Sequence, residues 1–113
     1  MSVTLYHNPK CSTSRKAVDL LQDKGIDAEV VEYLKAGWDA ETLNRLAKST
    51  GVGFTGLLRK REEEAKALIE RGASDDEIRA AMIANPVLVE RPIVETDKGA
   101  RIGRPLDSVL EIL

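Results

Sequence analysis

Val3-Thr4-Leu5-Tyr6-His7-Asn8-Pro9-Lys10-Cys11-Ser12-Thr13-Ser14-Arg15 is the stretch that decides how this chain folds. At its start, Val3 and Leu5 alternate with Thr and Tyr, which is typical of a β-strand. Beyond the stretch, Ala17, Leu20 and Leu21 recur at the spacing of one helix face. The sequence therefore predicts a strand, a turn that carries a cysteine, and a helix that begins directly after it.

The segments that follow extend this beginning into a larger α/β pattern. Residues 27–33 contain Val30 and Val31 and read as a second strand, which makes a right-handed β-α-β unit with parallel strands. Asp39 is a plausible N-cap of a helix that Gly51 ends. Good helix formers fill residues 62–71, and the capping-box pattern of residues 74–77 starts another helix. These segments predict a group of helices inserted after the second strand.

The last third of the chain predicts a hairpin and a final helix. Residues 93–96 and 100–102 read as strands, and Asp97-Lys98-Gly99 reads as the turn between them. Pro105 suits the first turn of a helix whose apolar residues are Leu106, Val109, Leu110 and Leu113. We therefore expect an α/β fold, a thioredoxin-like mixed sheet of about four strands with a helical insert, in one domain over residues 1–113.

Composition narrows the function classes. Of the 113 residues, 42% are apolar and 32% are charged, and the net charge is −2, so no basic excess points to nucleic acid or to an anionic membrane. No apolar run approaches the roughly 20 residues that span a bilayer, and the start lacks the apolar region of a signal peptide. We expect a cytoplasmic protein without a membrane partner, and a monomer, since no long coiled-coil heptad occurs.

The single cysteine carries the chemical hypothesis. A thiol at a helix N-terminus faces free backbone N–H groups and the positive end of the helix dipole, and both favour the nucleophilic thiolate. One cysteine and one histidine leave no internal disulfide and no Cys- or His-based metal centre to expect. The alternative is that Cys11 is an inert buried residue.

Three neighbours of Cys11 complete a candidate site. A protonated His7 would lower the thiol pKa by its charge, and the amides and hydroxyls of the turn around Ser14 and Arg15 can line an anion pocket. Each has a plainer alternative: His7 held by turn hydrogen bonds, Ser14 as a helix cap, and Arg15 as a solvated helix residue.

Four motifs, found in this order along the chain, favour the interpretation of Cys11 as a catalytic residue. They are His7-Asn8-Pro9 with Cys11 and Thr13-Ser14-Arg15, Leu57-Leu58-Arg59-Lys60, Arg91-Pro92-Ile93-Val94, and Arg104-Pro105 followed by Val109-Leu110-Glu111-Ile112-Leu113. With these motifs the chain resembles the glutaredoxin-dependent arsenate reductases of the ArsC family, from end to end. The resemblance implies that Cys11 attacks arsenate and that His7 aids thiol activation. It also implies that Arg59, Arg91 and Arg104 hold the oxyanion, and that Pro92 follows a cis peptide.

The resemblance further implies the reductant. Glutathione is the expected co-substrate and glutaredoxin the expected partner, with no bound cofactor, because a lone thiol cannot resolve its own adduct and needs an external one. Two alternatives stay open. One is a redox-sensing, transcription-regulating relative, although position 14 is serine and no second cysteine can form a disulfide. The other is a monothiol oxidoreductase whose arginines bind glutathione carboxylates.

Overall fold

The computed structural model describes residues 2–113 and divides them into two compact units. The described part of the first unit comprises residues 2–36 and 91–113, and the second unit is Gly37–Glu90. The first unit carries the predicted sheet and the second the predicted helical insert. That the two act as one domain stays a prediction.

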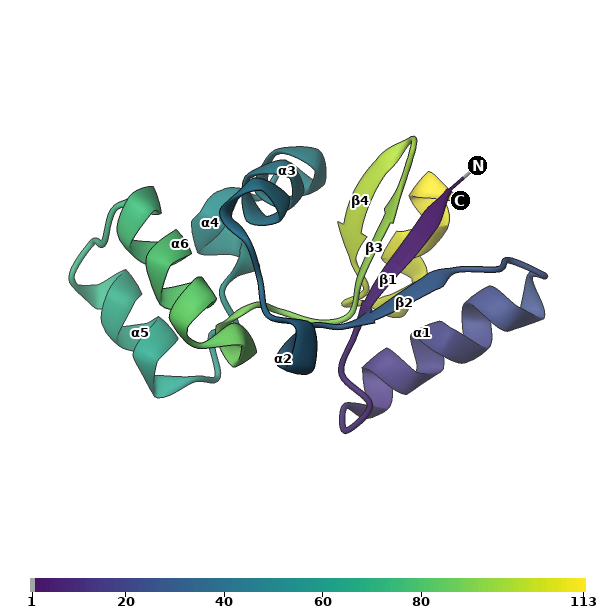
Figure 1. The fold of residues 1–113 in the computed structure, drawn as a ribbon, viewed down its shortest axis with the longest axis horizontal. Coiled ribbons are helices and arrows are strands. Elements are labelled where there is room, and N and C mark those ends of the chain that lie inside the picture. The colour runs from purple at the N-terminus through teal and green to yellow at the C-terminus, as the bar shows by residue number, and fades with distance from the viewer. Residues whose placement is uncertain (1) are drawn as a thin grey trace. The chain divides into compact units, whose positions relative to one another are not determined.

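A four-stranded mixed sheet forms the centre of the first unit. The strands β1 (Val3–His7), β2 (Glu29–Glu32), β3 (Ile93–Thr96) and β4 (Gly99–Ile102) lie in the order β2-β1-β3-β4. β1 pairs parallel with β2 and antiparallel with β3, and β3 pairs antiparallel with β4. This arrangement confirms the predicted thioredoxin-like mixed sheet (Figure 1). It also sets the end of β1 in the middle of the sheet, next to the turn that carries Cys11.

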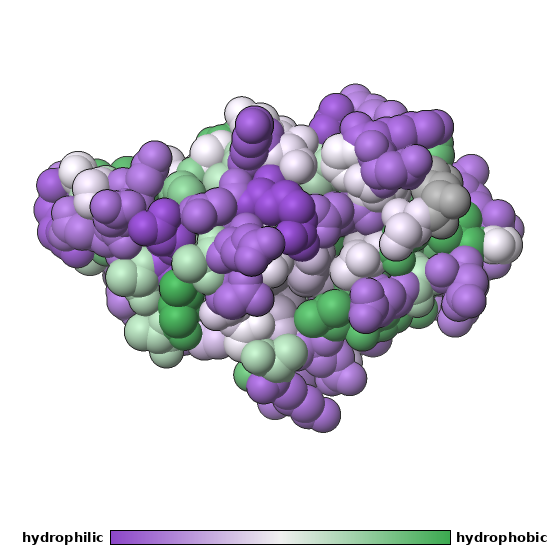
Figure 2. Space-filling view, turned by 45° about the horizontal axis from the view of Figure 1, so that its top comes forward, coloured by the Kyte–Doolittle hydropathy of each residue, from purple (hydrophilic) through white to green (hydrophobic). Residues whose placement is uncertain are grey.

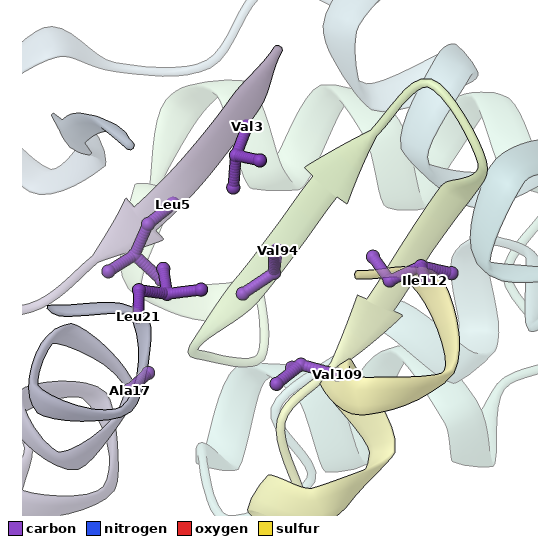
Figure 3. Packing of buried hydrophobic residues seen from close by; sticks show 7 residues of the cluster. All are labelled: Val3, Leu5, Ala17, Leu21, Val94, Val109 and Ile112. Atoms are coloured by element: carbon purple, nitrogen blue, oxygen red, sulfur yellow. The ribbon is translucent and has the colours of Figure 1, made fainter. Parts of the chain in front are cut away.

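The core of the first unit lies between this sheet and two helical segments, α1 (Ser12–Asp23) and the 3₁₀ helix η2 (Leu106–Ile112). Alternate residues of a strand point to the same face, so Val3 and Leu5 reach the core together. Figure 3 shows seven buried side chains gathered there: Val3, Leu5, Ala17, Leu21, Val94, Val109 and Ile112. Burying each large aliphatic side chain contributes about 1.5–3 kcal/mol, so this cluster fixes α1 against β1.

Two predicted elements of the first unit differ from the observed ones. The second strand covers Glu29–Glu32 rather than residues 27–33, because Tyr33 is fully buried and begins the short helix α2 (Tyr33–Ala36). The final helix is a 3₁₀ helix, preceded by Pro105 rather than including it. A spacing of three residues suits both helix types, so the apolar pattern could not distinguish them.

The hairpin and the proline geometry match the predictions. Thr96 pairs with Gly99 across a tight loop, so Asp97 and Lys98 form the turn, and Gly99, predicted as its third residue, begins β4. The Arg91–Pro92 peptide is cis, as the family resemblance implied, and the Arg104–Pro105 peptide is also cis.

The second unit is helical and contains α3 (Ala40–Thr50), α4 (Gly53–Leu57), α5 (Glu63–Glu70), α6 (Asp75–Ala84) and the 3₁₀ helix η1 (Pro86–Leu88). Asp39 caps α3 through the Thr42 N–H, and Gly51 ends it at a φ of 76°, a left-handed conformation that glycine adopts without strain. Ser74 forms the predicted capping box. No local pattern predicted α4, because a five-residue helix with two glycines has little helix propensity of its own.

Polar side chains cover most of the face shown in Figure 2, with hydrophobic ones in small separate patches. Within residues 2–113, no helix is both long and apolar enough to cross a membrane.

Candidate active site

The turn between β1 and α1, residues 7–15, holds the cysteine, and we call it the cysteine turn. Cys11 is the N-cap of α1 with extended backbone angles, φ −95° and ψ 122°. Its N–H donates to the Asn8 carbonyl at 3.0 Å, and its carbonyl accepts from the Arg15 N–H at 3.0 Å. These two bonds fix Cys11 at the helix N-terminus, as predicted, and its side chain is only half-buried.

Two arginines from the other end of the chain reach the cysteine turn within the first unit. Arg104 Nη2 donates to Cys11 Sγ at 3.3 Å, and Arg104 Nε donates to the Arg91 carbonyl at 2.7 Å. The second bond orients the guanidinium, since Arg104 is held at its Nε while its terminal nitrogen faces the sulfur. The structure thus brings Arg91 and Arg104 together with Cys11, which sequence spacing alone could not establish.

The surroundings of Cys11 favour the thiolate. Burial by itself would raise the pKa of the thiol. The Ser14 backbone N–H, hydrogen bonding and charge from Arg91, and the charge of Arg104 together outweigh burial, so the pKa of Cys11 lies below its ordinary value. A partly exposed thiol with a lowered pKa beside guanidinium groups is the environment of a reactive cysteine rather than an inert one.

Ser14 links the thiol to the histidine. Its side chain is fully buried, and its Oγ lies 2.6 Å from His7 Nδ1 and accepts the Asn8 N–H at 3.0 Å. With the Asn8 N–H as donor, the Ser14 hydroxyl is free to donate to an unprotonated His7 Nδ1. Ser14 therefore holds His7 by its hydroxyl while its backbone N–H serves the sulfur.

The surroundings of His7 oppose the protonated ring that the sequence suggested. Burial lowers the pKa of His7, the charge of Arg15 adds to the lowering, and the charge of Glu32 opposes it. The lowered pKa favours the neutral ring at neutral pH. The positive charge beside the thiol comes from Arg91 and Arg104 instead.

Arg15 closes the cysteine turn from outside. Its Nη1 donates to the Pro9 carbonyl at 2.9 Å in an exposed position. In the structure, Arg15 therefore stabilises the cysteine turn through this hydrogen bond. That Arg15 also binds the oxyanion stays a prediction.

Arg59 lies in the second unit and has a different setting. Its N–H donates to the Leu88 carbonyl at 2.7 Å, and its Nη1 donates to Glu90 Oε1 at 3.0 Å. Its Nε lies 3.8 Å from Glu62 Oε1. The Arg59 side chain is 11% exposed, so it is a nearly buried cation between two carboxylates. Its predicted role as an oxyanion ligand stays a prediction.

Sequence reasoning missed two residues that organise these groups. Asn8 is buried, and its Oδ1 accepts the Lys10 N–H at 3.0 Å, so it shapes the turn from both its backbone and its side chain. Glu90 pairs with Arg59. An Asn-Pro dipeptide inside the cysteine turn was a readable sign for Asn8, since asparagine side chains bond nearby backbone in turns. No local pattern marked Glu90.

The arrangement suits attack on an anion. A thiolate has two guanidinium groups beside it, and guanidinium groups bind tetrahedral oxyanions through several donors. Residues 2–113 contain no group of three His, Cys, Asp or Glu side chains placed to hold a metal.

Comparison with known proteins assigns the chain to one family. Residues 6–112 match the model described as the ArsC family. The chain is 37% identical to an arsenate reductase of Escherichia coli K12 over 114 aligned positions, which cover 99% of the chain and 81% of that protein. It is 44% identical to the E. coli K12 protein YfgD, covering 98% of the chain and 96% of YfgD. The structure of an arsenate reductase from Vibrio cholerae superposes with a TM-score of 0.92 at 45% identity, covering 100% of this chain and 98% of that one.

Proposed function

Because the chain belongs to the ArsC family, we propose that it reduces arsenate to arsenite with Cys11 as the nucleophile. The observation that carries the proposal is the contact of Arg104 Nη2 with Cys11 Sγ at 3.3 Å, beside a thiol whose pKa is lowered. The names of the E. coli and V. cholerae relatives support arsenate as the substrate.

The first step forms a covalent bond between sulfur and arsenic. The Cys11 thiolate attacks arsenic, a hydroxyl of arsenate leaves as water after it takes up a proton, and the S–As bond forms without any change in oxidation state. Arg91 and Arg104 hold the oxygens and offset the negative charge that two anions bring together, and Arg59 is the predicted third donor. Electrostatic donors of this kind are each worth about 2.7–4 kcal/mol in the transition state. We expect less from Arg59, because Glu62 and Glu90 already balance its charge.

Reduction follows when a second thiol attacks. A glutathione thiolate bonds to the Cys11 sulfur, the S–As bond breaks, and its electron pair stays on arsenic, which becomes arsenite. Two thiols are thereby oxidised to a mixed disulfide while arsenic gains two electrons. Glutaredoxin then reduces the mixed disulfide and restores the Cys11 thiol. An external thiol is needed because Cys11 is the only cysteine.

His7 reaches the sulfur only through Ser14. Ser14 fixes the neutral His7 ring at 2.6 Å and directs its own N–H at the sulfur. We assign both a positioning role for the nucleophile, which removes the need for a protonated imidazole.

The test is a coupled assay with the purified chain. Arsenate-dependent NADPH oxidation is followed in the presence of glutathione, glutaredoxin and glutathione reductase. We expect turnover only with both glutathione and glutaredoxin present, and none from Cys11→Ser. Efficient multiple turnover with thioredoxin and no glutathione would overturn the reductant, and turnover by Cys11→Ser would overturn the nucleophile.

A further inference from the structure

A groove of about 240 Å³ lies in the first unit beside the cysteine turn, and its function is not explained by the oxyanion chemistry. Its lining residues are Asn8, Pro9, Lys10, Glu32, Leu34 and Lys35. They come from the cysteine turn and from the end of β2 with the start of α2. The groove therefore connects the nucleophile's own loop to the neighbouring edge of the sheet.

The groove adjoins the nucleophile. Lys10 immediately precedes Cys11, and their Cα atoms are roughly 3.8 Å apart across a trans peptide. Asn8, which lines the groove, accepts the Cys11 N–H with its backbone carbonyl at 3.0 Å. A molecule that occupies the groove would therefore lie against the residues that directly precede Cys11.

The groove offers both signs of charge around an apolar surface. Glu32 and Lys35 form an ion pair with Lys35 Nζ 3.7 Å from Glu32 Oε1, and both side chains are open to solvent, 43% and 83% exposed. Lys10 is exposed on the other wall. Leu34 is 41% exposed and gives the groove an apolar side chain that a ligand can cover.

We propose that this groove binds glutathione as the co-substrate, an inference that rests on the proposed function for the identity of the thiol. The γ-glutamyl end carries an ammonium and a carboxylate on one carbon, which complement Glu32 and Lys35. The glycine carboxylate at the other end complements Lys10, and the chain between them lies over Leu34 and Pro9. The volume is somewhat below that of pockets that enclose a drug-sized ligand, so the tripeptide stays partly exposed and exchanges readily.

The groove carries charges of both signs, so it favours a different kind of ligand from the oxyanion site. A simple anion such as arsenate is best held by guanidinium groups, and Arg91 and Arg104 supply them beside Cys11. Glu32 would repel such an anion. The γ-glutamyl zwitterion instead needs one partner of each sign, and the Glu32–Lys35 pair supplies both.

The experiment measures glutathione recognition without arsenate. Cys11 thiolate attacks oxidised glutathione, the S–S bond of glutathione disulfide breaks, and a new bond joins Cys11 to one glutathione sulfur while glutathione thiolate leaves. The rate is compared with that for hydroxyethyl disulfide, which undergoes the same exchange but has no charge. The ratio of the two rates cancels changes in the reactivity of Cys11 and isolates recognition of the peptide.

Reversing the charge of a groove lysine should lower the ratio of the glutathione disulfide rate to the hydroxyethyl disulfide rate. In Lys10→Glu and in Lys35→Glu we expect the ratio to fall by about three- to tenfold, the scale of one exposed ion pair lost and one repulsion gained. Lys16→Glu is the matched control, because Lys16 is exposed on α1, lies outside the groove and changes the net charge equally. Raising the ionic strength should narrow the difference between parent and groove variants.

Each other outcome overturns the proposal. Equal ratios in the parent and in both groove variants would show that the groove does not bind the peptide. An equal fall in all three variants, Lys16→Glu included, would show an effect of net charge alone. A raised KM for glutaredoxin with an unchanged ratio would make the groove a protein-docking surface.

The same set of variants distinguishes this inference from the proposed function. In one outcome the parent does not reduce arsenate, but the ratio of the glutathione disulfide rate to the hydroxyethyl disulfide rate is lower in the two groove variants than in the parent and in Lys16→Glu. The groove then binds glutathione, and the arsenate proposal fails. If the parent reduces arsenate and the ratio is insensitive to Lys10 and Lys35, the arsenate proposal stands and the groove proposal fails.

Discussion

Arg104 and Arg59 are the same residue type in two compact units, and their neighbours give them different chemistry. Arg104 Nη2 lies 3.3 Å from the Cys11 sulfur, so its charge favours the thiolate. Arg59 donates to Glu90 at 3.0 Å and lies 3.8 Å from Glu62, so two carboxylates balance its charge. The role of an arginine in a family motif therefore depends on the groups that its guanidinium contacts. The arginines that lower the pKa of the Cys11 thiol, Arg91 and Arg104, both lie in the first unit.

Removal of the nucleophile should give the largest effect. Cys11→Ser keeps the size of the side chain but replaces a thiolate with a hydroxyl that stays protonated near neutral pH. We expect arsenate reduction to fall by roughly 10³-fold or more, on the scale of losing a nucleophile, with the circular dichroism spectrum unchanged. Substantial turnover by this variant in the coupled assay would contradict the comparison of the two arginines. The Cys11 thiolate that Arg104 favours would then not be needed for the reaction.

Replacing Arg104 should lower arsenate reduction far more than replacing Arg59. We expect Arg104→Gln to lower kcat/KM for arsenate by about 10²–10³-fold, since Arg104 serves both the thiolate and the oxyanion. Arg59→Gln should cost about tenfold or less, a difference of about 1.4 kcal/mol in transition-state binding. Arg104→Lys should recover only part of the loss, because lysine lacks the planar two-point contact. Equal losses from Arg59→Gln and Arg104→Gln would contradict the distinction.

The carboxylates around Arg59 should matter for folding. Glu90→Ala leaves a nearly buried guanidinium without its 3.0 Å partner and should lower the free energy of unfolding by about 1–3 kcal/mol. Glu62→Ala is the matched control, because Glu62 is more exposed and its contact is 3.8 Å, so we expect less than about 0.5 kcal/mol. Urea denaturation measures both. If Glu90→Ala were as mild as Glu62→Ala, Arg59 would not depend on the pair for its position.

His7 should give a smaller effect, visible as a pH dependence. Its pKa is lowered in the folded chain from 6.5, so the unfolded chain takes up a proton at higher pH than the folded one. The contribution of His7 to the free energy of unfolding is therefore present above pH 6.5 and is lost as the pH falls through the interval below that value. Replacement by asparagine should flatten the dependence of the unfolding free energy on pH between about 7.5 and 5. An unchanged slope in His7→Asn would show that the ring is not held in its neutral form.

The sequence predicted most of the first unit because local patterns are strong there. The alternation of Val3 and Leu5, the helical spacing after Ser12 and the Asp97-Lys98 turn are short-range signals, and the sheet follows from them. The end of the second strand was wrong by a residue because burial of Tyr33 favours a helical turn. In the second unit the capped helices were readable, whereas α4 depends on tertiary packing of Phe54 and Leu57.

For the candidate site, the sequence could single out residue types but not the contacts between them. A helix N-terminus was enough to single out Cys11. The partnership of Cys11 with Arg104 spans 93 positions of the chain, and no local pattern encodes it. The charge state of His7 was also out of reach, because it depends on burial by residues distant in sequence.

The most direct test of the central claim is the pH profile of alkylation of Cys11 by iodoacetamide, in the parent, Arg104→Gln and Arg59→Gln. We predict a midpoint in the parent below about 8.5, the value of a free thiol. We predict an upward shift in Arg104→Gln, because a guanidinium beside the sulfur is lost, and little change in Arg59→Gln. A parent midpoint near that of a free thiol, or an equal shift in both variants, would contradict the claim that Arg104, together with Arg91 and the Ser14 N–H, favours the Cys11 thiolate.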